Sequence, residues 1–180
     1  MTEDKSKELE KYITNIPDFP KKGILFRDIT SLIQHPKGFK LAIDLLKEKL
    51  LKEDFDAIVG LESRGFIFGA PLSYELEKGL IIARKKGKLP REVVTEEYDL
   101  EYGKAALEIH KDAITKGMKV IIIDDLIATG GTFSASVKLV EKLGGVVVGL
   151  YSVIELAGFD ARNKILKGYK VESLIKYEGK

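Results

Sequence analysis

The sequence predicts an α/β fold in which a doubly wound, mainly parallel sheet is flanked by helices. Short runs of apolar, often β-branched residues alternate along the chain with segments of helical periodicity, which is the pattern of repeated strand–helix units. The apolar runs lack the polar alternation of half-exposed strands, so both faces of each strand should be buried, as in parallel sheets covered by helices. The length of 180 residues suits a single domain.

The first expected elements are an N-terminal helix, an irregular segment and a second helix. Apolar residues recur at helical spacing up to Pro17, whose ring should end the run. Residues 17–30, PDFPKKGILFRDIT, are punctuated by Pro and Gly and predict irregular chain or a short strand. Apolar side chains share one face of residues 39–51, which predicts the second helix. The residues that define the first helix are Leu9, Tyr12, Ile13 and Ile16.

Strands and helices then alternate from residue 56 to residue 154. The last helix should stop at Gly144 and Gly145, since glycine commonly follows a helix C-terminus. Open parallel sheets bind ligands beyond the carboxyl ends of their strands, so the loops after Leu61 and Ile123 should carry the function. The predicted strands cover residues 56–61, 80–83, 120–123 and 146–154, and the predicted helices cover residues 65–77 and 133–143.

The composition excludes several classes of function. The 30 basic and 28 acidic residues give a net charge of +2, without the domain-wide basic excess of a nucleic-acid-binding protein. The absence of cysteine excludes disulfides, thiolate metal sites and a cysteine nucleophile, and two histidines, His35 and His110, are too few for a histidine-rich metal site. No apolar stretch approaches the roughly 18 residues that span a membrane, and the charged N-terminus lacks the apolar core of a signal peptide. We therefore expect a cytoplasmic protein that binds neither nucleic acid nor membrane.

The small net charge is the sum of opposite local charges. Residues 84–91, RKKGKLPR, hold five basic residues and no acidic one, whereas residues 92–101, EVVTEEYDLE, hold five acidic residues and no basic one. Most such runs are solvated surface. Five cations directly after a predicted parallel strand nevertheless suit a polyanionic ligand.

Residues 120–132, VIIIDDLIATGGT, combine an acid pair with a glycine loop. Glycines let several backbone N–H groups converge, and the N-terminus of the following helix adds unpaired donors and a positive partial charge, so the loop suits a phosphate group. The carboxylates of Asp124 and Asp125 would repel a phosphate and instead suit the hydroxyl groups of ribose. An ordinary strand–turn–helix with a capping Asp would explain one acid and one glycine, but the double acid followed by Thr-Gly-Gly-Thr favours a site. The chain contains no GxxxxGK[ST] or GxGxxG motif, which argues against a P-loop or a Rossmann dinucleotide site.

This stretch resembles the phosphoribosyl-diphosphate (PRPP) signature of type I phosphoribosyltransferases. Further segments resemble the adenine phosphoribosyltransferases, in the same order and at compatible spacing, so the resemblance covers nearly the whole chain. Lys22 is a departure, because relatives often carry Pro before the glycine. The matching segments are GILFRDIT (23–30), GLESRGFIFGAP (60–71), RKKGKLPRE (84–92), YDLEYGKAALEIH (98–110) and SLIKYE (173–178).

The resemblance implies the type I phosphoribosyltransferase fold in one domain, residues 1–180. Residues 1–35 or so would contribute a helix and a small N-terminal hood over the active site, and residues 92–104 or so would form a mobile catalytic lid. It implies that the acid pair holds the ribose 2- and 3-hydroxyls and that the base lies against the hood, with Leu126 or Ile127 as the opposite apolar wall. The implied 5-phosphate loop is Ala128, Thr129, Gly130, Gly131 and Thr132, and the implied adenine-binding residues are Leu25, Phe26 and Arg27.

For pyrophosphate, the resemblance implies a loop that often carries a cis peptide before its Ser, together with the basic segment. Arg84 would reach the neighbouring subunit's site. Glu101 would assist proton movement at the purine and Tyr102 would gate the site. The implied pyrophosphate-binding residues are Ser63, Arg64, Gly65, Arg84, Lys85 and Lys88.

The implied reaction is the transfer of the 5-phosphoribosyl group of PRPP to N9 of adenine, giving AMP and pyrophosphate. The implied cofactor is Mg²⁺, held mainly by substrate oxygens and water with no protein ligand needed, and the implied assembly is a homodimer. Two alternatives stay open: a phosphoribosyltransferase for another purine, and a PRPP-sensing regulator that binds without catalysis.

Overall fold

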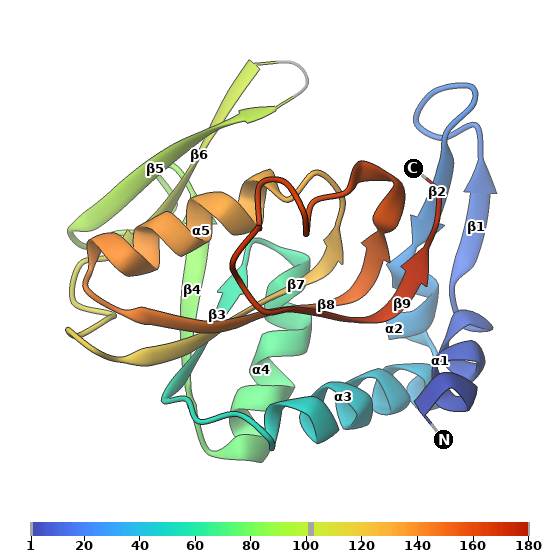
Figure 1. The fold of residues 1–180 in the computed structure, drawn as a ribbon, viewed down its shortest axis with the longest axis horizontal. Helices are drawn as coiled ribbons and strands as arrows, with labels where there is room; N and C mark the ends of the chain where they lie inside the picture. The colour runs from blue at the N-terminus through green and yellow to red at the C-terminus, as the bar shows by residue number, and fades with distance from the viewer. Residues whose placement is uncertain (1, 101–102, 180) are drawn as a thin grey trace.

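A sheet with strand order β5-β6-β4-β3-β7-β8-β9 forms the centre of the described chain, and a separate two-stranded sheet pairs β1 with β2 (Figure 1). The structure is a computed structural model, and it describes residues 2–100 and 103–179. The helices are α1 (Thr2–Glu10), α2 (Ile29–Gln34), α3 (Pro36–Leu50), α4 (Arg64–Leu76) and α5 (Gly131–Lys142), with a short 3-10 helix η1 (Ala157–Phe159). The strands are β1 (Thr14–Pro17), β2 (Leu25–Asp28), β3 (Ala57–Leu61), β4 (Gly79–Lys85), β5 (Val93–Leu100), β6 (Gly103–His110), β7 (Lys119–Ile127), β8 (Val146–Leu156) and β9 (Val171–Tyr177).

The central sheet confirms the predicted doubly wound α/β class. Strands β4, β3, β7, β8 and β9 pair in parallel, and β6 and β5 add an antiparallel edge. Alternate residues of β7 enter different cores: Ile121 and Ile123 pack with α3 and α4, whereas Val120 and Ile122 pack with α5. All four side chains are fully buried. The apolar run at 120–123 therefore lacks polar alternation because both of its faces are covered.

The N-terminal helix is shorter than the sequence predicts. It ends at Glu10, and Ile16 lies in β1 opposite Phe26 of β2. The hydroxyl of Ser31 accepts a hydrogen bond from Thr14 N at 2.9 Å, and it donates one to Tyr12 O at 2.7 Å. These contacts turn the chain out of the helix, so tertiary structure overrides the helical spacing of the apolar residues.

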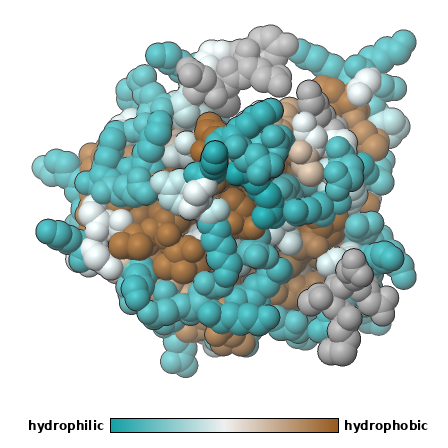
Figure 2. Space-filling model, viewed as in Figure 1, coloured by the Kyte–Doolittle hydropathy of each residue, from teal (hydrophilic) through white to brown (hydrophobic). Residues whose placement is uncertain are grey.

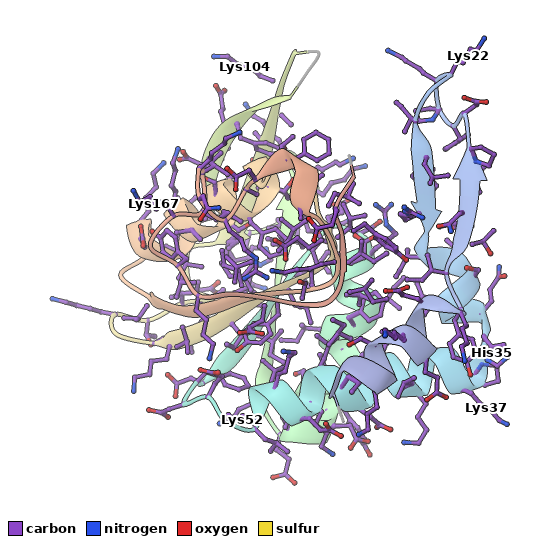
Figure 3. All side chains as sticks on the ribbon, turned by 45° about the vertical axis from the view of Figure 1, so that its right-hand side comes forward. Lys22, His35, Lys37, Lys52, Lys104 and Lys167 are labelled. Carbon is purple, nitrogen blue, oxygen red and sulfur yellow. The ribbon has the colours of Figure 1, made fainter. Side chains whose placement is uncertain are left out.

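The two-stranded sheet β1–β2 is the predicted hood, and it rises from the body of the molecule as an arm (Figure 1). Its loop contains a cis Phe19–Pro20 bond, and Asp18 Oδ1 accepts a hydrogen bond from Gly23 N at 2.6 Å. Lys22 is exposed at the tip of this arm (Figure 3). The departure from the family pattern at Lys22 is therefore a surface change.

The segment expected to be a mobile lid, residues 92–104 or so, covers β5 and the start of β6, and these two strands form an antiparallel hairpin. Its register runs from Val93 opposite His110 to Leu100 opposite Gly103. Val94 packs against the core beside α5, so the base of the hairpin belongs to the core. Figure 1 shows that the hairpin and the hood project to the same side of the molecule, on either side of the turn between β7 and α5. The mobility of the hairpin stays a prediction.

The face seen in Figure 2 is mostly hydrophilic, with hydrophobic residues visible in patches between charged side chains. None of the helices in the described ranges is both long and apolar enough to cross a membrane.

Candidate active site

The turn between β7 and α5 lines a polar cavity. Strand β7 continues through the acid pair to Ile127, whereas the sequence predicts that it ends at Ile123. Gly130 is the N-cap of α5 with φ of 83°, and a Cβ there would lie 2.7 Å from Ile165 Cγ2. Both the left-handed backbone and the close contact require glycine. No side chain caps the N-terminus of α5, which leaves its first amides available to an anion.

This cavity has a volume of about 270 Å³ and brings most of the expected PRPP residues together. The acid pair and the glycine loop line it beside Lys85 of β4, and Tyr98 of the hairpin borders it. The full lining is Glu62, Arg64, Lys85, Tyr98, Leu107, Asp124, Asp125, Leu126, Ile127, Ala128, Thr129, Gly130, Gly131, Thr132 and Phe133.

The two acids of the pair have different surroundings. Asp125 is buried, and its Oδ2 accepts a hydrogen bond from Arg64 Nε at 2.5 Å. Asp124 Oδ1 accepts a hydrogen bond from the backbone N–H of Asp125 at 2.8 Å. Burial and the adjacent Asp125 carboxylate raise the pKa of Asp124 well above its usual value.

The loop after β3 holds the expected cis peptide between Glu62 and Ser63. Ser63 is exposed and does not line the polar cavity, and Arg64 points to Asp125. Gly65 is buried where α4 crosses β7, since a Cβ there would lie 2.6 Å from Ile123 O. Gly65 therefore has a packing role, and pyrophosphate binding by these three residues stays a prediction.

Of the basic segment, only Lys85 lines the polar cavity. Its backbone N–H donates to Glu62 Oε2 at 2.8 Å, and Arg84 Nε contacts the same oxygen at 3.2 Å. Arg84 Nη1 also donates to Lys88 O at 3.2 Å. Although burial opposes it, these hydrogen bonds lower the pKa of Glu62. Sequence analysis gave Glu62 no role, yet it fixes the backbone that presents Lys85.

A second cavity of about 480 Å³ lies between the hood and the sheet. Leu25, Phe26 and Arg27 line it from β2, as the resemblance implied. Leu126 and Ala128 line the side formed by the β7–α5 segment, whereas Ile127 is buried and borders only the polar cavity. Leu126 is thus the better candidate for the opposite wall. The two cavities share Arg64, Asp125, Leu126 and Ala128.

Two contacts qualify the roles of the hood residues. Phe26 packs edge-on against Phe19, with ring centroids 5.1 Å apart. The Arg27 guanidinium lies 3.9 Å from the centre of the Tyr177 ring and donates to Asn15 Oδ1 at 2.5 Å. Arg27 therefore joins the two strands of the hood and ties the hood to β9, as well as lining the cavity.

Leu156 and Phe159 also line the second cavity, although no sequence motif predicts a role for either. They are ordinary apolar residues in no motif, so only the fold could place them there.

The model of the phosphoribosyl transferase domain matches residues 28–175. A curated adenine phosphoribosyltransferase of Lachnoclostridium phytofermentans is 58% identical over 174 residues, which are 97% of this chain and 99% of that protein. This chain belongs to the adenine phosphoribosyltransferases. The family assignment drawn from the motifs is thus confirmed.

Solved adenine phosphoribosyltransferases share the fold along almost their whole length. That of Thermoanaerobacter pseudethanolicus superposes with a TM-score of 0.91 at 51% identity, over 96% of this chain and 99% of its own. That of Saccharomyces cerevisiae gives a TM-score of 0.89 at 40% identity over 96% and 99%, and it is complexed with D-2,5-dideoxy-2,5-imino-altritol 1,6-bisphosphate and adenine. The type I phosphoribosyltransferase fold predicted from the resemblance is confirmed.

The two catalytic residues expected in adenine phosphoribosyltransferases, Glu101 and Tyr102, lie outside the described residues. The strands on either side of them end at Leu100 and begin at Gly103, whose φ is 103°. Lys104, next in β6, lies towards the far end of the hairpin (Figure 3). Their catalytic roles therefore stay predictions.

Proposed function

We propose that this chain transfers the 5-phosphoribosyl group of PRPP to N9 of adenine, giving AMP and pyrophosphate in purine salvage. The observation that carries the proposal is the pair of adjoining cavities. One is polar, with a glycine loop, an acid pair and a lysine, and the other is lined by apolar and aromatic side chains. Their shared residues, Asp125 and Leu126 among them, stand where the sugar of a nucleotide would join its base.

In this arrangement the β7–α5 turn binds the 5-phosphate, and the acid pair holds the ribose hydroxyls. Gly131 and Thr132, at the start of α5, present backbone amides to the phosphate, and Thr129 and Thr132 add hydroxyl groups. Anchoring the sugar at both points fixes C1 in line with the base. Much of the barrier lowering would come from this positioning.

Adenine would stack on Phe26, with Leu126 on its other side. Base–aromatic stacking contributes about 1–3 kcal/mol per base. Backbone groups around Leu25, which lines this cavity, would read the edge of the purine.

Lys85 would neutralise the diphosphate of PRPP, with Ser63, Arg64, Gly65, Arg84 and Lys88 as further pyrophosphate residues. Asp124 and Asp125 present carboxylate oxygens to the same cavity, which is the donor type that Mg²⁺ takes. The ion itself would be held mainly by diphosphate oxygens and water. When bound, it would supply charge neutralisation for the leaving pyrophosphate.

The tip of the hairpin would close over PRPP and exclude water. Glu101 would assist proton movement at the purine as N9 attacks C1, and Tyr102 would gate the site. The transition state would carry oxocarbenium character, so a nearby carboxylate would stabilise it as well.

We further propose a cytoplasmic homodimer. Ile67 and Tyr74 of α4 and Leu80 of β4 are exposed apolar or aromatic side chains on adjoining elements. Large exposed apolar residues that adjoin one another are typical of protein interfaces. Sedimentation of the chain should give twice the monomer mass, and a Tyr74→Glu variant should shift it to the monomer.

The deciding experiment is AMP formation from adenine and PRPP, with and without Mg²⁺. We expect turnover that depends on both substrates and on the ion. A panel of adenine, guanine, hypoxanthine and xanthine separates this proposal from a phosphoribosyltransferase for another purine. PRPP binding by calorimetry with no turnover on any purine would instead favour the PRPP-sensing regulator.

A further inference from the structure

The crossover connection, residues 157–170 between β8 and β9, lines the apolar cavity and packs against the glycine loop of the polar cavity. It passes beside the turn between β7 and α5 (Figure 1). On the phosphate side, Ile165 Cγ2 and Ala161 Cβ lie 2.7 Å and 3.1 Å from the position that a Cβ of Gly130 would take. On the base side, Phe159 lines the apolar cavity. A displacement of this connection would therefore alter both substrate sites at once.

One side chain, Arg162, joins this connection to the two strands that flank it. Its Nε donates to Glu155 Oε1 and its Nη2 to Glu155 Oε2, each at 2.6 Å, and its Nη1 donates to the carbonyl of Val171. Glu155 lies near the carboxyl end of β8, and Val171 is the first residue of β9. Beyond η1, the connection otherwise consists of turns. The guanidinium thus fixes the position of a segment that does not pair in a β-sheet.

The partner carboxylate is buried and fully engaged. The Glu155 side chain is 4% exposed, and its Oε2 also accepts the Ser173 hydroxyl at 2.7 Å. Burial opposes ionisation, but the hydrogen bonds from Arg162 and Ser173 outweigh it and lower the pKa of Glu155. A bidentate arginine–carboxylate pair fixes the orientation of the guanidinium as well as its distance from the carboxylate. The pair therefore sets the position of Arg162 and of the chain on either side of it.

We propose that Arg162 is a positioning residue for both substrates, through its fork on Glu155. It touches neither cavity, and it acts by holding Phe159 at the base site and the Ala161–Ile165 side of the connection against Gly130. The inference rests on the proposed function, because the two sites it serves are those of adenine and PRPP. Affinity for both substrates should depend on it.

The test compares Arg162→Met with the double variant Arg162→Met/Glu155→Gln. Methionine keeps most of the side-chain volume, and the double variant avoids leaving a buried carboxylate without its partner. We expect the KM for adenine and the KM for PRPP each to rise roughly five- to tenfold in both variants, because a displaced wall loses contacts with the bound substrate. Misalignment of the two substrates should lower kcat as well. Arg162→Lys should restore less than half of the lost affinity, because lysine cannot form the fork.

Lys167→Met is the matched control. Lys167 lies on the same connection and is exposed at the outer surface (Figure 3). This substitution removes a cation without touching Glu155, and both KM values should stay within twofold of the wild type. A purely structural role for Arg162 would lower the melting temperature and the active fraction but leave both KM values unchanged. That result would overturn the inference.

A second measurement separates this inference from the proposed function. Amide hydrogen exchange in residues 126–133 and 157–166 should accelerate in Arg162→Met and not in Lys167→Met, whatever reaction the site performs. Wild-type protein that makes no AMP would refute the proposed function, and the exchange pattern would then decide the positioning role alone. Unchanged exchange in both segments would refute that role.

Discussion

Asp124 shows how a single residue can lower the stability of the fold in favour of binding. Burial and the Asp125 carboxylate raise its pKa. A carboxyl group with a raised pKa binds its proton more tightly in the folded state, so its contribution to stability falls as pH rises from the ordinary value through the folded pKa. Above that pH range Asp124 is ionised in both states, and its charge has a higher free energy in the folded state than in the unfolded state. The ionised side chain therefore lowers the stability of the fold. Binding of the ribose hydroxyls, as proposed above, would be a reason to keep this charge.

We therefore expect Asp124→Asn to raise the melting temperature near neutral pH and to raise the KM for PRPP about tenfold or more. An amide oxygen can still accept from the Asp125 N–H, while a hydrogen bond to a charged group contributes about 1.5–3 kcal/mol. The gain in melting temperature should shrink as pH falls and vanish below the ordinary pKa of 3.8, where Asp124 is protonated in both states. Thermal unfolding across this pH range tests the charge, and steady-state kinetics tests the ribose contact. A pH-independent gain would argue against the electrostatic cause.

Phe26 allows a test of the base site alone. Its ring lines the apolar cavity and not the polar one. Phe26→Ala should raise the KM for adenine about tenfold, in keeping with the stacking energy of a base, and change the KM for PRPP less than twofold. Phe19→Ala is the control, because Phe19 contacts Phe26 edge-on but does not line the cavity. Equal effects of Phe26→Ala on both substrates would rule out the stacking role.

At the scale of elements, the β7–α5 turn combines backbone strain with a close contact. Gly130→Ala should weaken PRPP binding by at least tenfold and lower the melting temperature, because a Cβ at Gly130 meets Ile165 and the backbone φ is positive. Gly168→Ala is matched to it, since Gly168 has φ of 95° and open space around it. That control carries the conformational cost of a left-handed alanine, about 1–2 kcal/mol, without the contact. Equal losses in the two variants would show that the contact contributes nothing.

The base of the hairpin is held to α5 by charge. The Glu96 side chain is 13% exposed and pairs with Lys138 at 3.3 Å and with Lys142. The hydrogen bond from Lys142, which outweighs the opposing effect of burial, lowers the pKa of Glu96. A lowered carboxyl pKa gives stability that is present above the ordinary value of 4.5 and is lost as pH falls through the folded value.

Glu96→Gln should accordingly lower the melting temperature by about 2–4 °C at neutral pH, with a smaller loss below about pH 4. Amide exchange in residues 93–98 should also accelerate. Glu97→Gln is the control, because Glu97 and Lys104 are 4.0 Å apart and well exposed. The same loss at every pH would show that packing, and not charge, holds the hairpin to α5.

The elements differ in how far the sequence could predict them. Buried strands such as β3 and β7 are evident as apolar runs, because both faces are covered. The acidic sequence of the hairpin does not predict strands. Its acids are held by partners far away in the sequence, as Glu96 is by Lys142, so no local pattern reveals the pairing. The glycine loop was recognisable because phosphate binding needs particular residue types. Phe159 and Arg162 act through their place in the fold, which no local pattern records.

At the scale of the whole molecule, the charges are segregated although they nearly cancel. The net charge is +2, yet Arg64 and Lys85 line the polar cavity and the basic run 84–91 follows the strand beside it. Several acids elsewhere on the surface are paired with lysines, as in Lys40–Asp44 and Lys47–Glu75. Glu62, Asp124 and Asp125 also line the cavity, so the attraction for a polyanion must come from the basic run beside it, and a neutral base should not feel that attraction.

This asymmetry makes the salt dependence of the two substrates different. Raising ionic strength from about 0.02 M to about 0.5 M shortens the screening length to well under 10 Å. The value of kcat/KM for PRPP should then fall several-fold, because attraction of the anion is screened. The value of kcat/KM for adenine, measured at saturating PRPP, should stay within about twofold. Lys85→Met should lower kcat/KM for PRPP at low salt and flatten its salt dependence, because it removes a cation from the cavity. Arg91→Met changes an exposed pair with Asp112 and should leave most of the dependence in place. Parallel salt profiles for the two substrates would mean that ionic strength acts on the fold and not on capture of the anion.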